Sequence, residues 1–132
     1  MQNIFDKDDL LVSVHRFDEW KAGLDFITSD DEFLQAGTWR YDKGKVLDRH
    51  YHNHLPRVSE HTQECVVVLS GSLRVEVFGL TQNAICTFDL KQGDFAVFLR
   101  GGHRYEILAD DTRILETKNG PFLGVDLDKT RF

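Results

Sequence analysis

The sequence predicts an all-β domain, a jelly-roll barrel of short antiparallel strands with one short N-terminal helix. Apolar residues either alternate with polar ones or form short runs, as in Cys65–Leu69 and Phe95–Leu99. Turn signals rich in Gly, Asn and Asp separate these segments at intervals of about 8–12 residues, which is typical of sandwiches and barrels. No pattern indicates the alternating strands and helices of a parallel sheet.

The composition indicates one folded domain. The chain has 132 residues, of which 41% are hydrophobic and 10 are Phe, and this length buries a sizeable core. The 16 basic and 22 acidic residues give a net charge of −6, and no basic stripe interrupts the acidic surface. Nucleic acid and anionic membranes are therefore not expected as partners, because phosphate binding needs clustered Lys and Arg.

The sequence also predicts a cytoplasmic protein. Its apolar runs are much shorter than the roughly 20 residues of a membrane helix. The start, MQNIFDKDDLL, has acidic residues where a signal peptide has basic and apolar ones. Cys65 and Cys86 lie in apolar strand patterns, so we expect buried thiols and no disulfide.

The N-terminal part is predicted to contain one strand and one helix. Leu11–Phe17 has the pattern of an opening strand. Residues 18–27 follow, with an Asp that can cap a short helix. Trp20, Leu24 and Ile27 then fall on one helical face at the i, i+4, i+7 spacing.

Further strands are expected along the rest of the chain. Phe33–Tyr41 places Trp39 and Tyr41 on one side, where they either wall a pocket or fill the core. Residues 42–44 then turn the chain into a strand that begins at Lys45. The remaining predicted strands are 65–69, 73–78, 84–90, 95–99, 104–109 and 113–118.

Three histidines carry the first functional signal. His50, His52 and His54 stand at alternate positions, so on a strand they share one face. Glu64 opens the apolar strand that follows. Imidazoles beside a carboxylate at the mouth of a β-structure indicate a metal site. Pro56 suggests that pairing has ended by His54, because Pro cannot donate a ladder hydrogen bond.

These motifs resemble those of the cupin superfamily. Its first motif has HxH, then Glu, then six residues and Gly, and Glu64 and Gly71 keep that last spacing. Its second motif is similar to GDFAVFLRGGH, residues 93–103. The resemblance implies a cupin-like double-stranded β-helix and the metal ligands His50, His52, Glu64 and His103.

This sequence departs from the general cupin pattern at three points. The gap between His52 and Glu64, residues 53–63, is longer than usual, so His54 or His61 could replace one ligand. Leu99 stands in place of the second motif's Pro. His103 arrives one residue early, and no Asn ends the motif.

Nearly the whole chain also resembles a narrower group of small single-domain bacterial cupins, often associated with surface-polysaccharide and sugar-modification gene clusters. In that group the long gap is normal and includes an Arg, here Arg57, which favours His50 and His52 over the other histidines. The likeness lies in FLQAGTWRYDKGKVL, HxH, TQE, GGHRYEIL and KNGPFLGVDLDKTRF. It implies one cupin domain over 1–132, with an N-terminal strand and helix (1–32), a barrel (33–118) and a C-terminal tail (119–132).

Two functions are consistent with these residues. In the first, the chain is a metal-dependent cupin enzyme that acts on a small polar molecule, for example a sugar or sugar-nucleotide. The ligand set suits Fe, Mn, Ni, Cu or Zn, and the residues do not separate an isomerase or epimerase from a dioxygenase. In the second, the chain is a non-catalytic ligand-binding or sensory cupin. Arg57 and Tyr105 are the candidate substrate-binding residues in either case, because Tyr105 shares a face with His103 and Arg57 can meet a carboxylate or phosphate.

A homodimer is the expected assembly. Cys65, Val67 and Leu69 are apolar on the face opposite Glu64, Val66 and Val68, so both faces of this strand need cover. The N-terminal segment supplies that cover, or a second copy does. We expect a C2 dimer with a sheet-to-sheet interface.

Overall fold

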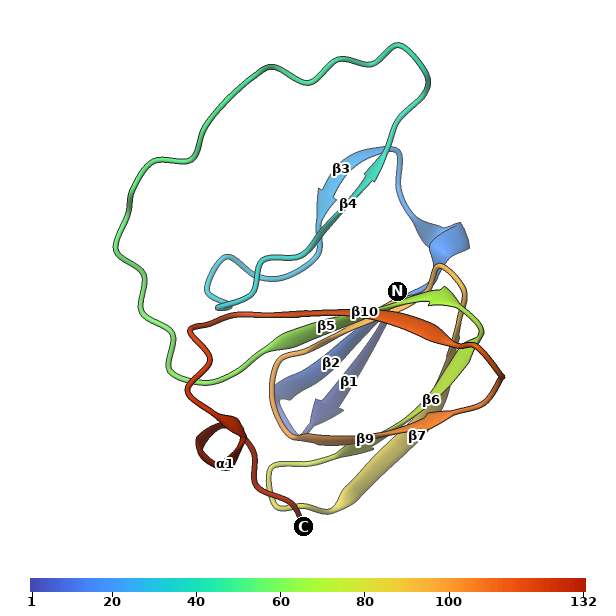
Figure 1. Ribbon diagram of the computed structural model, residues 1–132, viewed down its shortest axis with the longest axis vertical. Coiled ribbons are helices and arrows are strands. Elements are labelled where there is room, and N and C mark those ends of the chain that lie inside the picture. Colours follow the sequence, from blue (N-terminus) through green and yellow to red (C-terminus); the bar gives the residue numbers. More distant parts are fainter.

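The computed structural model describes residues 1–132 and shows an all-β fold built from antiparallel sheets (Figure 1). The helices are one 3-10 turn, η1 (Phe17–Glu19), and one short helix, α1 (Val125–Asp128). Neither has the length and apolar character needed to cross a bilayer. The strands are β1 (Gln2–Asp6), β2 (Asp9–His15), β3 (Gly23–Phe26), β4 (Gly37–Arg40), β5 (Glu64–Ser70), β6 (Ser72–Phe78), β7 (Ala84–Lys91), β8 (Phe95–Phe98), β9 (Gly102–Ile107) and β10 (Arg113–Lys118).

Two sheets enclose the main core. The larger has five strands in the order β1-β2-β8-β5-β10, and the smaller has three in the order β7-β6-β9. The inner residues of β6, Leu73, Val75 and Val77, are buried and alternate with more exposed neighbours, as their sequence pattern predicts. They pack against Val66 and Val68 of β5, so the core lies between the sheets.

The outer face of the five-stranded sheet is partly covered. Cys65, Phe95, Val97 and Leu99 form a second buried cluster on this face. Trp20, Ile27, Leu34 and Ala36, from the segment around the β3–β4 hairpin, pack against it. The N-terminal segment therefore supplies part of the cover that the apolar outer face of β5 requires.

The segment predicted as an N-terminal helix is mostly extended. Only η1 is helical there, and residues 23–26 form β3, which pairs with β4. Gly23 begins this strand with a φ of +89°, a conformation that interrupts a right-handed helix. The prediction of a helix over 18–27 was wrong. Trp20, Leu24 and Ile27 have a helical spacing, but Leu24 and Phe26 also have the alternate spacing of a strand, so the pattern does not separate the two structures.

The strand predicted from Lys45 is also absent. Residues 41–63 form a long connection without strand or helix, and it arches away from the sheets (Figure 1). The predicted strand Phe33–Tyr41 is reduced to β4. Strand β1, which the sequence analysis did not predict, pairs with β2. No closed barrel forms, because the two main sheets remain separate.

A histidine is buried at the end of β2. His15 is 6% exposed, and its ring stacks on Phe95 with 4.8 Å between the centroids. Its Nε2 is 2.8 Å from the Ser13 hydroxyl, which donates to Asn3. Burial, together with the positive N-terminus, lowers the pKa of His15 from 6.5 to about 4.

His15 predicts a loss of stability in mild acid. Between pH 6.5 and 4 the unfolded chain binds this proton more readily than the folded chain does. The free energy of unfolding should therefore fall over this interval, with His15 contributing roughly 1–3 kcal/mol. In urea unfolding at several pH values, His15→Gln should flatten this part of the profile, and the exposed control His54→Gln should not. An unchanged slope in His15→Gln would contradict the prediction.

Candidate functional site between the two sheets

Glu64 is a buried carboxylate that faces the space between the two main sheets, where His103 and Tyr105 contact it. It begins β5 and is 4% exposed. Neighbouring β8 pairs with it at Phe98, and β10 pairs with it at Lys118. A buried carboxylate needs charged or hydrogen-bonding partners, since its desolvation is costly.

Strand β9 of the opposite sheet supplies those partners. The Nε2 atom of His103 is 2.9 Å from Oε1 of Glu64, and the Tyr105 hydroxyl donates to the same oxygen at 2.7 Å. His103 and Tyr105 stand two residues apart, and β9 pairs them with the buried Val77 and Val75 of β6. The sequence prediction that they share a face is therefore confirmed.

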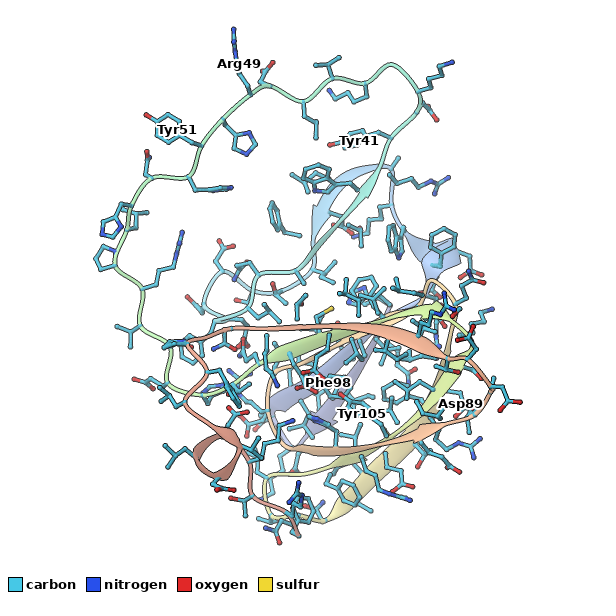
Figure 2. The ribbon with its side chains drawn as sticks, in the orientation of Figure 1. Tyr41, Arg49, Tyr51, Asp89, Phe98 and Tyr105 are labelled. Carbon is cyan, nitrogen blue, oxygen red and sulfur yellow. The ribbon has the colours of Figure 1, made fainter.

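An aromatic wall surrounds this contact. The Phe98 ring lies 4.6 Å from that of His103 and 5.7 Å from that of Tyr105, measured between centroids. Figure 2 shows Phe98 and Tyr105 together between the sheets. The His103 side chain is 26% exposed, so solvent reaches the site from its side. Sequence reasoning did not single out Phe98, because its position in an apolar strand indicates only core packing.

The site holds Glu64 in its charged form. Burial raises the pKa of Glu64, but the hydrogen bonds from His103 and Tyr105 and the charge of His103 outweigh it and lower the pKa to about 2. Burial and the adjacent carboxylate raise the pKa of Tyr105, so its phenol stays protonated. The arrangement therefore combines an anionic acceptor, an imidazole and a neutral hydroxyl donor.

The structure does not bring the HxH histidines to this contact. His50 and His52 lie on the arched connection, both exposed, with 5.3 Å between their ring centroids. Figure 2 shows their neighbours Arg49 and Tyr51 far from Tyr105. The expectation that these histidines lie on a strand was wrong: residues 45–54 have no strand partner. No three His, Cys, Asp or Glu side chains converge at one point.

The other candidates lie on the same connection. His54 and Arg57 are exposed, like His50 and His52, and no strand precedes Pro56 whose end it could mark. His61 is also exposed but is anchored: its ring is 4.8 Å from that of Phe33, and its carbonyl accepts from Asn119.

Gln63 fixes the end of the connection next to Glu64. Its side chain is fully buried, accepts from the backbone N–H of Leu34 at 2.8 Å and donates to Glu32. Glu32 also pairs with Arg100 at 2.8 Å. The sequence analysis did not identify this role of Gln63. The only sequence signal for it is a polar residue placed directly before an apolar strand.

Comparison of the chain with protein families, with curated proteins and with solved structures finds no match.

Removal of the Tyr105 hydroxyl should change the pKa of Glu64 measurably. Tyr105→Phe removes one of its two side-chain donors, so the pKa of Glu64 should rise from about 2 toward 4.5. The depressed pKa stabilises the folded chain above pH 4.5, and this stabilisation is lost as the pH falls through the folded value. At pH 7 the free energy of unfolding of Tyr105→Phe should therefore be about 1–3 kcal/mol lower than that of the wild type.

Carboxyl ¹³C titration of Glu64 and chemical denaturation measure these two effects. The matched control is Tyr51→Phe, since the Tyr51 side chain is 87% exposed and has no contact with Glu64. A Glu64 pKa equal in the wild type and in Tyr105→Phe would show that the phenol does not hold the carboxylate.

Proposed function

We propose that Glu64 and His103 are two ligands of a divalent transition-metal site in a cupin-like protein that acts on a small polar molecule, with a sugar or sugar-nucleotide as the first candidate. The observation that carries the proposal is the 2.9 Å contact between the buried Glu64 carboxylate and His103 Nε2. It unites Glu64 of the first cupin-like motif with His103 of the second. The expected double-stranded β-helix belongs to this proposal too.

The spacing of the two donor atoms fits one metal ion. Carboxylate oxygens and imidazole nitrogens bind such ions at about 2.0–2.2 Å, so adjacent ligands lie about 3 Å apart. Glu64 and His103 match this separation at 2.9 Å. The donors, one oxygen and one nitrogen, suit Fe, Mn, Ni, Cu or Zn. Tyr105 donates to the Glu64 oxygen and thereby holds the carboxylate in one orientation.

His50 and His52 are the proposed remaining ligands. Residues 53–63 separate His52 from Glu64, and a chain of that length spans about 36–40 Å when extended. The connection is therefore long enough to return to the site. The neighbouring rings of His50 and His52 form a ready pair of nitrogen donors on it.

Each residue of the proposed site would have a distinct role. Glu64, His103 and the two loop histidines hold the ion, which supplies Lewis acidity or oxygen activation when bound. Phe98 and Tyr105 wall the space beside His103 and limit the access of water. Arg57, on the same connection as the histidines, would contact a carboxylate or phosphate of the substrate.

A metal-free binding function is the second candidate. Its support is the hydrogen-bonded set of Glu64, His103 and Tyr105, which is complete without a further group. In a ligand-binding or sensory cupin, the exposed side of His103 and the wall at Tyr105 would contact the ligand directly. Elemental analysis separates the two candidates.

Metal content is the primary test. Untagged protein purified without chelator should carry about one divalent transition-metal ion per chain, measured by mass spectrometry of the elements. Glu64→Gln and His103→Ala should each lose the ion because each removes a ligand atom. If the wild type holds no metal and added Ni²⁺ or Fe²⁺ does not raise its Tm, the metal proposal fails and the metal-free candidate remains.

The loop histidines provide an internal ranking. In a metal titration followed by calorimetry, His50→Ala should weaken binding by orders of magnitude. His54→Ala and His61→Ala are the matched controls on the same connection and should change it little. The reverse ranking would assign His54 or His61 to the site in place of His50.

We also propose that the protein forms a C2 homodimer. Leu69 of β5 and Leu115 of β10 lie on the outer face of the five-stranded sheet, beside the part that the hairpin covers. They are 52% and 49% exposed. A second copy that packs its own Leu69 and Leu115 against them would remove this apolar surface from water.

If the protein forms this dimer, a charge introduced at Leu69 or Leu115 should dissociate it. Leu115→Glu would bury an unpaired carboxylate at the interface, so it should shift the mass measured by light scattering at micromolar concentration from dimer to monomer. The control is Leu80→Glu, which places the same charge at an exposed leucine in the turn after β6. A monomeric wild type would refute the assembly.

A further inference from the structure

A pocket lies on the opposite side of the five-stranded sheet from Glu64. It has a volume of about 460 Å³ and lies between η1 and the β3–β4 hairpin. Trp20, one of its walls, contacts Phe95 on the outer face, whereas Glu64 and Phe98 face the inner core. The pocket is thus separated from the proposed metal site by the sheet itself. Its lining residues are Phe17, Asp18, Trp20, Trp39, Arg40 and Tyr41.

One wall of this pocket is anchored to the sheet. The Phe17 backbone N–H donates to the buried Asp94 carboxylate at 3.1 Å. Its ring packs so closely on Gly93 that a Cβ there would be 2.8 Å from Phe17 Cγ. Trp20 meets both Phe17 and Phe95 edge-on, at 5.3 and 5.9 Å between centroids. The wall is therefore held in place without a ligand.

The other wall is carried by the hairpin. Trp39 is 57% exposed and Tyr41 is 41% exposed, although both are large aromatic side chains. Between them in sequence, Arg40 donates from Nη1 to the carbonyl of Trp20 at 2.8 Å, which links the two walls. The Trp39 ring is thus exposed beside the first wall, and the Tyr41 ring is partly exposed, with Lys45 Nζ over it at 5.7 Å from its centroid.

The charged groups that line the pocket are one carboxylate and one guanidinium, those of Asp18 and Arg40. The Asp18 carboxylate makes no ion pair or hydrogen bond within the protein, and Arg40 uses only one nitrogen. The indole Nε1–H of Trp20 is buried and has no acceptor in the protein. A carboxylate only accepts hydrogen bonds, and guanidinium and indole N–H groups only donate them.

This combination favours a ligand without net charge that can both donate and accept hydrogen bonds. A simple anion is opposed by Asp18, and a simple cation is opposed by Arg40. A hydroxyl group both donates and accepts, so a ring with several hydroxyls satisfies both charges at once. The apolar C–H face of such a ring packs on aromatic side chains, and the pocket's volume lies in the range of small-molecule sites.

We propose that this pocket binds a neutral polyhydroxylated ring, such as a pyranoside, stacked on Trp39 and Tyr41 with its hydroxyls toward Asp18 and Arg40. This inference stands apart from the proposed metal site: none of the pocket residues belongs to that site, and neither requires the other.

The protein carries its own reporter for this pocket. The chain has 2 Trp, and both line the pocket. Intrinsic tryptophan emission and the two indole ¹H–¹⁵N signals therefore report on it without a label. The probes are the methyl pyranosides of glucose, galactose, mannose and N-acetylglucosamine, with choline and benzoate as the cationic and anionic alternatives.

At least one pyranoside should shift both indole signals saturably, with a Kd on the order of 1 mM for a ligand of this size. Trp39→Ala should weaken that binding at least tenfold, read from the Trp20 indole, and Asp18→Asn should weaken it several-fold. Phe26→Ala is the matched control, since Phe26 is 63% exposed on the same hairpin but does not line the pocket.

Three results would overturn the proposal. The first is the absence of any saturable shift with the four pyranosides up to 100-fold above the expected Kd. The second is a shift that survives in Trp39→Ala. The third is saturation by choline or benzoate alone, which would assign the pocket to an ion. Amide chemical shifts of each variant, compared with those of the wild type, confirm that it remains folded.

Discussion

The buried charge of Glu64 is the constraint on which the arrangement of the two main sheets depends. Glu64 belongs to one sheet, and both of its side-chain partners, His103 and Tyr105, belong to the other. The remaining contact between these sheets is largely apolar and non-directional. A buried carboxylate without partners is strongly destabilising, so the sheets have to meet in the register that brings β9 to it. The same requirement concentrates a charge, an imidazole and a hydroxyl at one point.

The residue before Glu64 has a complementary effect on the chain. Gln63 ties the loop between β3 and β4, at Leu34 and Glu32, to the start of β5, and its backbone N–H donates to Asn119 at 2.6 Å. The connection that carries His50 and His52 is thus fixed at its end but has few contacts along its middle. Long connections of this kind cost little additional entropy per residue and often carry function. The contact of Glu64 with His103 and Tyr105 is therefore held by the two sheets, whereas His50 and His52 lie on a connection with few contacts.

The sequence predicted those elements whose pattern has one interpretation. Strand β6 was predicted with the correct buried face because Leu73, Val75 and Val77 alternate with polar residues, and the pairing of His103 with Tyr105 on one face follows from the same rule. Residues 18–27 fit both the helical and the strand periodicity. The positive φ of Gly23 interrupts a helix there, and residues 23–26 form a strand. The HxH stretch showed alternation without a partner strand, and alternation alone does not create one. Gln63 and the aromatic pocket depend on tertiary contacts that no local pattern contains.

The proposed metal site implies that ligand binding and loop order are coupled. Two ligands, Glu64 and His103, are held by the sheets, whereas His50 and His52 belong to an extended connection. Ordering that connection costs conformational entropy, of about 1–2 kcal/mol for each residue fixed. Binding energies of structural metal sites are about 10–16 kcal/mol and are large enough to offset the ordering of several residues. Affinity would then depend on the stiffness of residues 53–63 as well as on the ligands, because a less flexible connection has less entropy to lose when it closes over the site.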